Sequence, residues 1–201
     1  MRIHTIRKEY PMTQEEVLTI LKNTGALLHG HFELRSKLHS PEYFQCANLL
    51  RYPLEAGRIC AELAAKIPAE IAAKATTVVS PALGGILVGH EVARALGKMC
   101  IFAEKQDGVL VMRRFKIAPG ELCIVAEDVV TKGGRVQETI DLVHAAGGKV
   151  LAVATIVDRS SGTVKFGDIP HYSVLQMSPV TYEPSVCPLC ASGSKAVHPG
   201  S

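Results

Sequence analysis

Four short apolar runs alternate with segments of helical character through most of the chain. The apolar runs cover residues 76–80, 99–103, 122–126 and 149–157. Between them, residues 86–96 and 135–146 predict helices, the first of which Gly97 closes. Short apolar strands that alternate with helices indicate a mostly parallel sheet that helices cover on both faces.

The first third of the chain predicts a smaller unit of mixed α and β structure. Thr13 and Glu16 form a capping box at the start of a helix that Gly25 ends. Residues 32–47 contain short strand-like runs around a polar turn. A second helix, over residues 53–67, has a proline in its first turn and another just after its end.

Length and composition favour one globular domain. The chain has 201 residues, of which 47% are hydrophobic and 20% charged. No apolar run approaches the roughly 20 residues that a membrane span requires, and the first seven residues lack the apolar core of a secretory signal. A net charge of +3 gives no reason to expect nucleic acid as a partner. We therefore expect a cytoplasmic protein that binds neither membrane nor nucleic acid.

Four cysteines lie in apolar segments and are expected to be small buried side chains in a reducing compartment. They are Cys46, Cys60, Cys100 and Cys123. The chain after residue 184 is rich in proline, glycine and serine, and we expect it to lack regular structure.

Two other groups of residues suggest transition-metal chemistry without establishing it. Cys187 and Cys190 have the spacing of metal ligands, but they are only half of a four-ligand zinc site. His29, His31 and His39 are irregularly spaced in a region of strands and turns. We expect two reduced thiols, and histidines with ordinary polar or substrate-side roles, rather than a metal site.

In a parallel sheet of this kind, ligands bind beyond the carboxyl ends of the strands. The loops expected there cover residues 80–85, 126–135 and 158–162. All three combine glycine with polar or charged residues, so the candidate chemistry of the chain is concentrated at one edge of the predicted sheet.

The loop over residues 126–135 suits a sugar phosphate. Glu127 and Asp128 come where an apolar run ends, and Thr131, Gly133 and Gly134 precede a helix. Glycines and the start of a helix let backbone N–H groups approach a phosphate. The two carboxylates would repel that anion, and a ribose diol or Mg²⁺ beside them would supply a suitable partner. An acidic strand end followed by an ordinary helix cap is the alternative.

These segments carry a specific resemblance. Residues 123–134 resemble the phosphoribosyl diphosphate (PRPP) signature of type I phosphoribosyltransferases. Along almost its full length the chain resembles the shorter bacterial and archaeal orotate phosphoribosyltransferases. The segments that carry this second resemblance are residues 25–36, 39–44, 80–85, 157–159, 187–190 and 198–201.

The resemblance implies an α/β protein with the type I phosphoribosyltransferase fold. In this fold a mostly parallel central sheet is flanked by helices, and a small N-terminal α+β hood covers the substrates. The single domain would then consist of a hood, approximately residues 1–52 plus the C-terminal segment, and a core, approximately residues 53–175.

The resemblance also implies which residues bind PRPP. They would be Lys105, Glu127, Asp128, Val129, Val130, Thr131, Lys132, Gly133, Gly134 and Arg135. Of these, Lys105, Glu127 and Asp128 would be catalytic. The diphosphate would bind at Ala82, Leu83 and Gly84. Mg²⁺ would be held mainly through substrate and water, with no firm protein ligand.

Recognition of orotate would involve five residues by the same resemblance. They would be Thr131, Arg159, Arg35, Tyr43 and Phe44. A guanidinium suits the planar carboxylate or carbonyls of orotate. An isolated loop arginine is more often a solvated surface group, and the position at the mouth of the same crevice favours the binding role.

A basic segment separates the second and third predicted strands. Residues 105–116 contain four basic side chains and one acidic one, a local charge of +3. The resemblance implies a mobile catalytic loop that reaches into the neighbouring subunit of a homodimer, with Lys105 contacting phosphate. For Arg113 and Arg114, a solvated hairpin with Gly108 at its tip is an equal alternative.

Four positions depart from the commonest pattern of the family. Arg35 and Gly84 stand where many longer relatives carry lysine. Lys132 replaces a small or hydroxyl residue, and Arg135 replaces serine or threonine. These last two cations would either strengthen phosphate binding or point outward.

The function implied is the reaction of orotate with PRPP to give orotidine 5′-monophosphate and diphosphate, in pyrimidine biosynthesis. Transfer to another base and a non-catalytic PRPP-sensing regulator on the same fold are alternatives. No helix-turn-helix or basic stripe supports a regulator. The absence of a P-loop and of a Rossmann fingerprint argues against a general nucleotide-binding protein.

Overall fold

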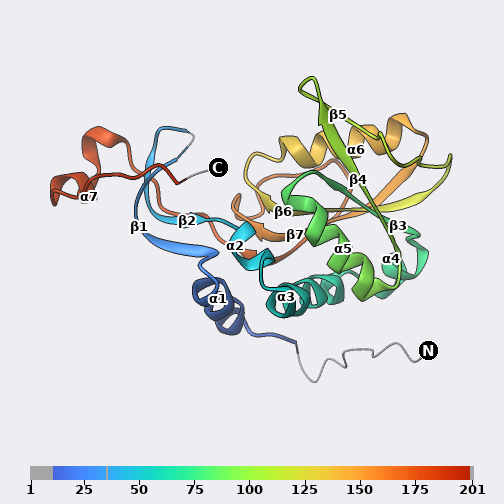
Figure 1. The fold of residues 1–201 in the computed structure, drawn as a ribbon, viewed down its shortest axis with the longest axis horizontal. Helices are drawn as coiled ribbons and strands as arrows, with labels where there is room; N and C mark the ends of the chain where they lie inside the picture. The colour runs from blue at the N-terminus through green and yellow to red at the C-terminus, as the bar shows by residue number, and fades with distance from the viewer. Residues whose placement is uncertain (1–10, 35, 200–201) are drawn as a thin grey trace.

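Six strands form the central sheet of the protein (Figure 1). The computed structural model describes residues 11–34 and 36–199. In spatial order the strands are β5 (Val109–Val111), β4 (Met99–Gln106), β3 (Thr77–Pro81), β6 (Leu122–Val130), β7 (Lys149–Asp158) and β8 (His171–Gln176). All neighbouring pairs are parallel except β4 and β5, so the predicted mostly parallel sheet is confirmed.

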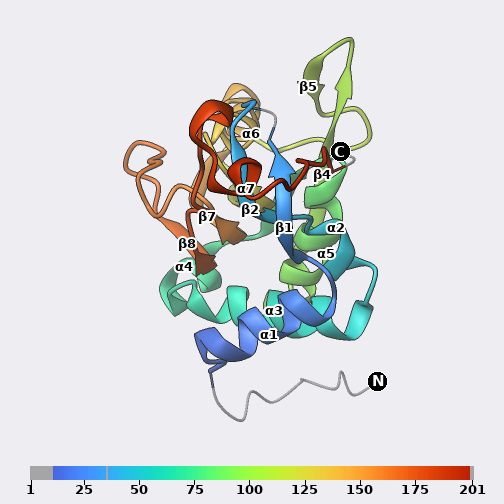
Figure 2. The same cartoon turned by 90° about the vertical axis from the view of Figure 1, so that its left-hand side faces the viewer.

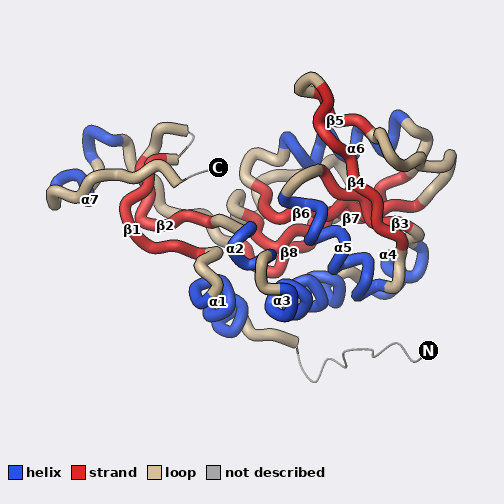
Figure 3. Tube along the Cα trace, in the orientation of Figure 1, coloured by secondary structure: helices blue, strands red, loops and turns tan. Residues whose placement is uncertain are grey.

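Helices cover both faces of this sheet (Figure 3). On one face α5 (Gly84–Leu96) packs on β3, β4 and β6, and α3 (Pro53–Lys66) packs on β7 and β8. On the other face α6 (Gly134–Ala145) packs on β6 and β7. Side chains of each strand alternate between the two faces: Ile124 is buried in the α3–α5 layer and Val125 in the α6 layer. Burial on both faces explains why the strands are continuous apolar runs.

Strand β6 is longer than its apolar run. It was predicted to end at residue 126, but it pairs with β7 as far as Val130, opposite Asp158. Glu127 and Asp128 therefore lie within the strand and not in the loop that follows. Charged side chains hid this continuation in the sequence, whereas the ladder of hydrogen bonds to β7 maintains it.

The hood contains a separate two-stranded antiparallel sheet, made of β1 (Leu27–Glu33) and β2 (His39–Phe44). The C-terminal segment runs beside this hairpin, with bridges between Phe32 and Val197 and between His39 and Tyr182. Figures 1 and 2 show the two chain regions side by side, away from the main sheet. Helix α1 (Gln14–Asn23) precedes the hairpin and begins with the predicted capping box of Thr13 and Glu16.

The C-terminal segment has more regular structure than its composition predicted. It contains a 3₁₀ turn, η1 (Pro184–Val186), and a short helix, α7 (Pro188–Ala191). The expectation of an irregular tail was therefore wrong. Contacts with the hood hairpin order this segment, and such tertiary contacts leave no periodic signal in so short a stretch.

Three further elements were absent from the prediction. They are α2 (Ala47–Leu50), α4 (Ala69–Lys74) and β8. The two helices are too short for a periodic signal, and none of the residues of α4 is fully buried. In the part of the chain that the structure describes, no helix is both long and apolar enough to cross a membrane.

Candidate active site

The carboxyl ends of β3, β6 and β7 bring three loops to one edge of the sheet. Two backbone hydrogen bonds fix the loops relative to the strands. Ala82 N donates to Ala103 O at 2.7 Å, and Arg159 N donates to Val130 O at 2.8 Å. The parallel register thus places residues 80–85, 131–134 and 158–162 together, as the sequence predicted.

The loop after β3 packs directly on the acidic pair of β6. A Cβ atom built on Gly84 would lie 2.7 Å from Asp128 Oδ2, and one built on Gly85 would lie 2.9 Å from Glu127 Oε1. Such distances are too short for any side chain, so glycine is required at both positions unless the carboxylates move. The peptide bond between Ala82 and Leu83 in this loop is cis.

The two carboxyl groups are withdrawn from solvent. Glu127 is 6% exposed and Asp128 is half-buried. Burial raises the pKa of Glu127 well above its usual value, and the neighbouring charge of Asp128 raises it further. Burial also raises the pKa of Asp128. A cation or hydroxyl groups placed against this pair would favour its ionised form.

Backbone amides partly offset the desolvation of the pair. Asp128 N donates to Glu127 Oε1 at 3.0 Å, and Val129 N donates to Asp128 Oδ1 at 2.8 Å. The charge of Arg135 acts on both carboxyl groups and lowers the pKa of each, although burial has the larger, opposite effect. The carboxylate oxygens are therefore held in place by the strand while remaining poorly neutralised.

The loop between β6 and α6 has the geometry of an anion site. Gly133 is the N-cap of α6 and has a φ of +79°, which favours glycine. A Cβ atom there would also meet Val164 Cγ1 at 2.7 Å, whereas the space beside Gly134 is open. The first amides of α6 therefore have room for a phosphate at the positive end of the helix dipole.

The two unusual cations of this loop lie in different environments. Thr131 and Lys132 are exposed, with Lys132 free to point into solvent. Arg135 is half-buried, and within the described part of the chain its Nη1 atom is buried without a hydrogen-bond partner. A buried guanidinium nitrogen without an acceptor is costly, and an anionic ligand would satisfy it.

The loop after β7 is organised by Asp158, a residue that the sequence analysis did not select. This carboxylate is fully buried and accepts hydrogen bonds from Ser160 N at 2.8 Å, Ser160 Oγ at 2.6 Å and Gly162 N at 2.9 Å. The sequence Asp-Arg-Ser-Ser-Gly, with serines and a glycine shortly after the aspartate, is typical of a side chain that folds its own turn, so a sequence signal existed. The turn holds Arg159 at the edge of the sheet.

The side chain of Arg159 points toward the hood. Burial lowers the pKa of Arg159, while the groups of Tyr43 and Cys46 act in the opposite direction. Its Nε atom is buried and has no hydrogen-bond partner in the part of the chain described. Like Arg135, Arg159 thus has a buried N–H group without a hydrogen-bond acceptor among the described residues.

The predicted hood residues have different surroundings. Tyr43 is half-buried, and its ring lies 5.8 Å from that of Phe32. Phe44 is 5% exposed and belongs to the hydrophobic core, so its side chain anchors β2 and we retain only Tyr43 as a candidate contact. Arg35 lies outside the described residues, as do the first ten residues and the last two.

The basic segment forms a hairpin of β4 and β5 that projects from the body of the protein (Figure 1). Asp107 and Gly108 make its tight turn, with φ values of 51° and 83°. Arg114 Nε lies 2.9 Å from Glu104 Oε2, whereas Arg113 and Lys105 are exposed. Among the described residues, Lys105 has no hydrogen bond or ion pair, so the chain by itself does not join it to the acidic pair.

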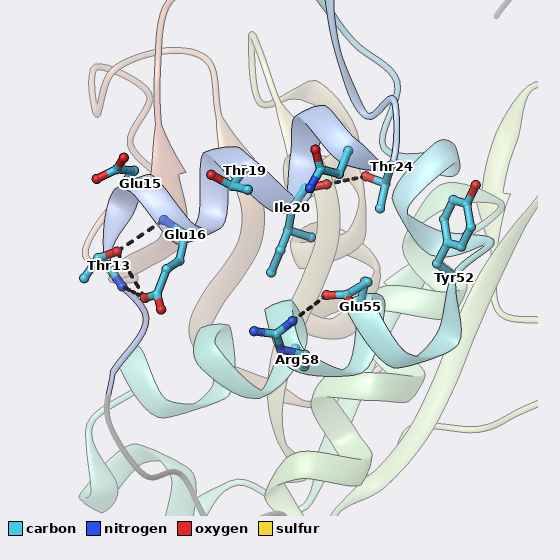
Figure 4. Close-up of a pocket in the computed structure, with 10 residues that line it drawn as sticks. Thr13, Glu15, Glu16, Thr19, Ile20, Thr24, Tyr52, Glu55 and Arg58 are labelled. Carbon is cyan, nitrogen blue, oxygen red and sulfur yellow. Dashed lines mark hydrogen bonds and ion pairs between the residues drawn. The ribbon is translucent and has the colours of Figure 1, made fainter.

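A groove between α1 and α3 is a second concave surface, shown in Figure 4. Its polar side chains bond locally. Thr13 and Glu16 form the capping box, Arg58 Nη1 donates to Glu55 Oε2 at 2.9 Å, and Thr24 Oγ1 donates to Ile20 O at 2.8 Å (Figure 4). These satisfied groups give the groove no catalytic constellation, in contrast to the edge of the sheet.

Comparison with known proteins shows the family of the chain. The model of the phosphoribosyl transferase domain matches residues 52–170. The orotate phosphoribosyltransferase of Acidithiobacillus ferrooxidans is 47% identical to the chain over 191 residues, covering 94% of this chain and 98% of that protein. The chain belongs to the orotate phosphoribosyltransferase family. The family assignment made from the sequence is therefore confirmed.

Solved structures show the same fold at low sequence identity. The crystal structure of orotate phosphoribosyltransferase from Aeropyrum pernix has a TM-score of 0.66 and 22% identity, covering 80% of this chain and 93% of that one. Adenine phosphoribosyltransferase from Thermoanaerobacter pseudethanolicus has a TM-score of 0.65 and 15% identity, covering 82% of this chain and 100% of that one. The fold is shared by enzymes named for different bases, so it does not select the base.

The raised pKa values lead to a prediction about stability. Because burial raises the pKa of Glu127, the folded state holds this proton more tightly than the unfolded state, and stability falls as pH rises above about 4.3. Glu127→Gln should therefore increase the free energy of unfolding at pH 8 by on the order of 1 kcal/mol. For a chain of this size this corresponds to a rise in Tm of about 2–4 °C.

Thermal unfolding of the ligand-free protein at pH 4 and pH 8 measures this effect. The gain should be present at pH 8 and nearly absent at pH 4, where Glu127 is neutral in the folded state and largely neutral in the unfolded state. Glu138→Gln, a change at an exposed position of α6, is the matched control. A gain of equal size at both pH values would show that burial of the ionised Glu127 side chain is not its cause.

Proposed function

We propose that this chain transfers the phosphoribosyl group of PRPP to orotate, releasing diphosphate and forming orotidine 5′-monophosphate for pyrimidine biosynthesis. The observation that carries the proposal is the packing of the Gly84–Gly85 loop against the buried carboxyl groups of Glu127 and Asp128. This contact would give a diphosphate and a ribose adjoining places at the edge of the sheet. Membership of the orotate phosphoribosyltransferase family supports orotate as the base.

PRPP would lie across the ends of β3 and β6. Its 5-phosphate would bind the loop over residues 131–134 and the first amides of α6, with Arg135 Nη1 donating to it. Glu127 and Asp128 would accept hydrogen bonds from the ribose hydroxyls. The backbone of Ala82, Leu83 and Gly84 would bind the diphosphate. Val129 and Val130 would shape the site through the strand backbone, and exposed Lys132 would contribute at most long-range charge.

Orotate would lie between the ribose and the hood. Arg159 has an unsatisfied, buried Nε atom and would donate to the carboxylate or a carbonyl of orotate. Tyr43 would border the ring from the hood, and Thr131 would reach it from the phosphate loop. We expect Arg35 to act on the same side, as the family resemblance implies.

The residues at this edge also fit Mg²⁺ as a cofactor. The acidic pair provides oxygen atoms that are poorly neutralised by the protein, and this is the ligand chemistry that Mg²⁺ prefers. When bound, Mg²⁺ would neutralise the diphosphate of PRPP and lower the pKa of both carboxyl groups. We expect it to be held mainly through substrate oxygens and water.

The chain itself contributes orientation and electrostatic stabilisation. An N–H ring nitrogen of orotate attacks the anomeric carbon of PRPP and loses its proton to water. The bond from that carbon to the diphosphate oxygen breaks, and the leaving group takes the electron pair. Positive charge develops on the ribose ring during this step. The fixed carboxylates of Glu127 and Asp128 would stabilise that charge without having to reorganise.

We propose that Lys105 acts across the subunit interface of a homodimer. It is exposed and lies on the projecting hairpin of β4 and β5, where it would reach the diphosphate of a neighbouring subunit. Within residues 105–116, Arg113 and Lys116 are also exposed and would add positive charge near the diphosphate.

We further propose that the hood and core act as one domain, and that the protein is cytoplasmic.

An assay of the purified protein with several bases tests the proposed reaction. With PRPP and Mg²⁺, we expect orotidine 5′-monophosphate from orotate, and the product should disappear when a chelator removes the metal. Adenine and uracil should give at least about 100-fold lower kcat/KM, because neither carries the carboxylate that Arg159 would bind. Efficient use of another base without orotate turnover would reject orotate as the substrate, and PRPP binding without any turnover would favour a regulator.

Asp128→Asn and Arg159→Ala should impair different steps. Loss of the ribose-side charge should lower kcat by about 100- to 1000-fold, as for other groups that stabilise transition-state charge. Loss of Arg159 should raise the KM for orotate by about 10- to 100-fold, with a smaller effect on PRPP. Asp141→Asn and Arg58→Ala alter exposed residues of α6 and α3 and are matched controls. Unchanged kinetics in Asp128→Asn would contradict the ribose assignment.

Mixing two inactive variants tests whether Lys105 acts across a subunit interface. Lys105→Ala and Asp128→Asn should each be nearly inactive alone. If the hairpin enters the neighbouring site, dissociation and random reassociation should restore about one quarter of the parental activity. Half of the dimers would then be mixed, and each mixed dimer would have one intact site. Absence of recovery in mixed dimers that have formed would place Lys105 in its own subunit's site or outside catalysis.

A further inference from the structure

Four side chains with metal-binding atoms lie close together in the hood. They come from two segments that are far apart in the sequence. His31 and His39 come from the β1–β2 hairpin, and Cys187 and Cys190 from the start of α7 and the helix itself. Their potential ligand atoms all lie within 4.8 Å of one another. The sequence alone predicts reduced thiols at Cys187 and Cys190, because they are only half of a four-ligand zinc site. It predicts ordinary polar or substrate-side roles for His29, His31 and His39, because their spacing is irregular.

The distances within this cluster fit tetrahedral coordination. For zinc, with bonds of about 2.3 Å to sulfur and 2.0–2.1 Å to nitrogen, tetrahedral ligand atoms lie roughly 3.3–3.8 Å apart. His31 Nε2 is 3.6 Å from Cys187 Sγ and 3.7 Å from Cys190 Sγ. His39 Nδ1 is 3.3 Å from Cys190 Sγ and 2.9 Å from His31 Nε2. To bind an ion, the two imidazole nitrogens would have to separate by a few tenths of an ångström. The ligand atoms that lie up to 4.8 Å apart would have to approach by about 1 Å.

A backbone carbonyl orients His31 for this role. His31 Nδ1 lies 3.1 Å from Ser194 O, and a carbonyl only accepts, so this nitrogen carries the proton. The Nε2 atom of a neutral His31 ring is then the one with a free electron pair, and it faces the cluster. A ligating histidine whose other nitrogen donates to a carbonyl is the usual arrangement around protein-bound metals.

The ligand cluster is largely buried, whereas most of the C-terminal segment is exposed. His31, His39 and Cys187 are 6%, 7% and 2% exposed, and Cys190 is half-buried. From residue 181 to residue 199, Cys187 is the single buried residue, and Val186 and Val197 are 73% and 54% exposed. Apolar packing therefore contributes little to holding this segment against the hairpin.

We propose that His31, His39, Cys187 and Cys190 bind one zinc ion that fastens the C-terminal segment to the hood. Two thiolates and two neutral imidazoles balance the charge of Zn²⁺ and supply the nitrogen and sulfur ligands that it prefers. Four protein ligands fill the coordination shell, so the ion is structural and does not activate water or substrate. This site is distinct from the Mg²⁺ proposed for catalysis, which requires oxygen ligands.

The zinc site would act on the hood through the backbone that carries its ligands. Val197 N donates to His31 O, and His39 exchanges two backbone hydrogen bonds with Tyr182, all at 2.9 Å. These few bonds and the ion would together hold residues 182–197 to the hairpin. Metal binding is then coupled to folding of the hood, because the ligands are brought together only in the folded state.

Metal analysis of the purified parent protein tests the proposal without reference to activity. The protein is expressed in zinc-supplemented medium and freed of loosely bound ions. Elemental mass spectrometry should then find about one zinc ion per chain. Replacement by Co²⁺ should give the intense visible bands of tetrahedral cobalt and near-ultraviolet thiolate-to-cobalt charge-transfer bands. A parent protein without zinc and without these bands would overturn the proposal, as would a disulfide between Cys187 and Cys190 in freshly purified protein.

Single substitutions identify the ligands. Cys190→Ser and His39→Asn should each reduce zinc content by at least about tenfold after dialysis against a competing chelator. His29→Asn changes an exposed histidine of the same hairpin, and Cys100→Ser changes a half-buried cysteine of β4, so both should retain one zinc. Full zinc retention in Cys190→Ser and His39→Asn would refute this ligand set. If these variants fail to fold, the cobalt spectrum of the parent still decides whether the site exists.

Discussion

The contact between the Gly84–Gly85 loop and the carboxyl groups of Glu127 and Asp128 is the constraint on which the active-site edge depends. Two glycines allow the loop after β3 to approach within a distance that no side chain would permit. The same approach withdraws the carboxyl groups from water and raises the pKa of each. The close packing of the loop and the raised pKa values of the carboxyl groups therefore have the same cause. We expect the substrate to stabilise the ionised carboxyl groups while the packing of the loop is kept.

Two arginines extend this arrangement to the ends of the site. Arg135, beside the start of α6, and Arg159, after β7, each have a buried nitrogen without a hydrogen-bond partner among the described residues. An unsatisfied buried donor lowers stability, and functional sites commonly retain such features. In the proposed complex, Arg135 would bind the phosphate end of PRPP and Arg159 would bind the carboxylated base.

The hood requires a different kind of stabilisation from the core. The central sheet is buried by helices on both faces, whereas β1 and β2 form a small separate sheet beside a C-terminal segment with one buried residue. Tyr43 lies on this small sheet and faces the same edge as Arg159. A zinc ion held by His31, His39, Cys187 and Cys190 would give the substrate-facing hood a fixed shape without a large apolar core.

The sequence by itself determined the parallel sheet, its principal helices and the family. Apolar runs, capping residues and the segment over residues 123–134 are local signals, and local signals survive without knowledge of the fold. Only the tertiary structure decided that β6 continues through Glu127 and Asp128 and that Phe44 belongs to the core. It alone joined His31 and His39 to Cys187 and Cys190. Each of these features depends on contacts between segments distant along the chain, and spacing within one segment carries no information about such contacts.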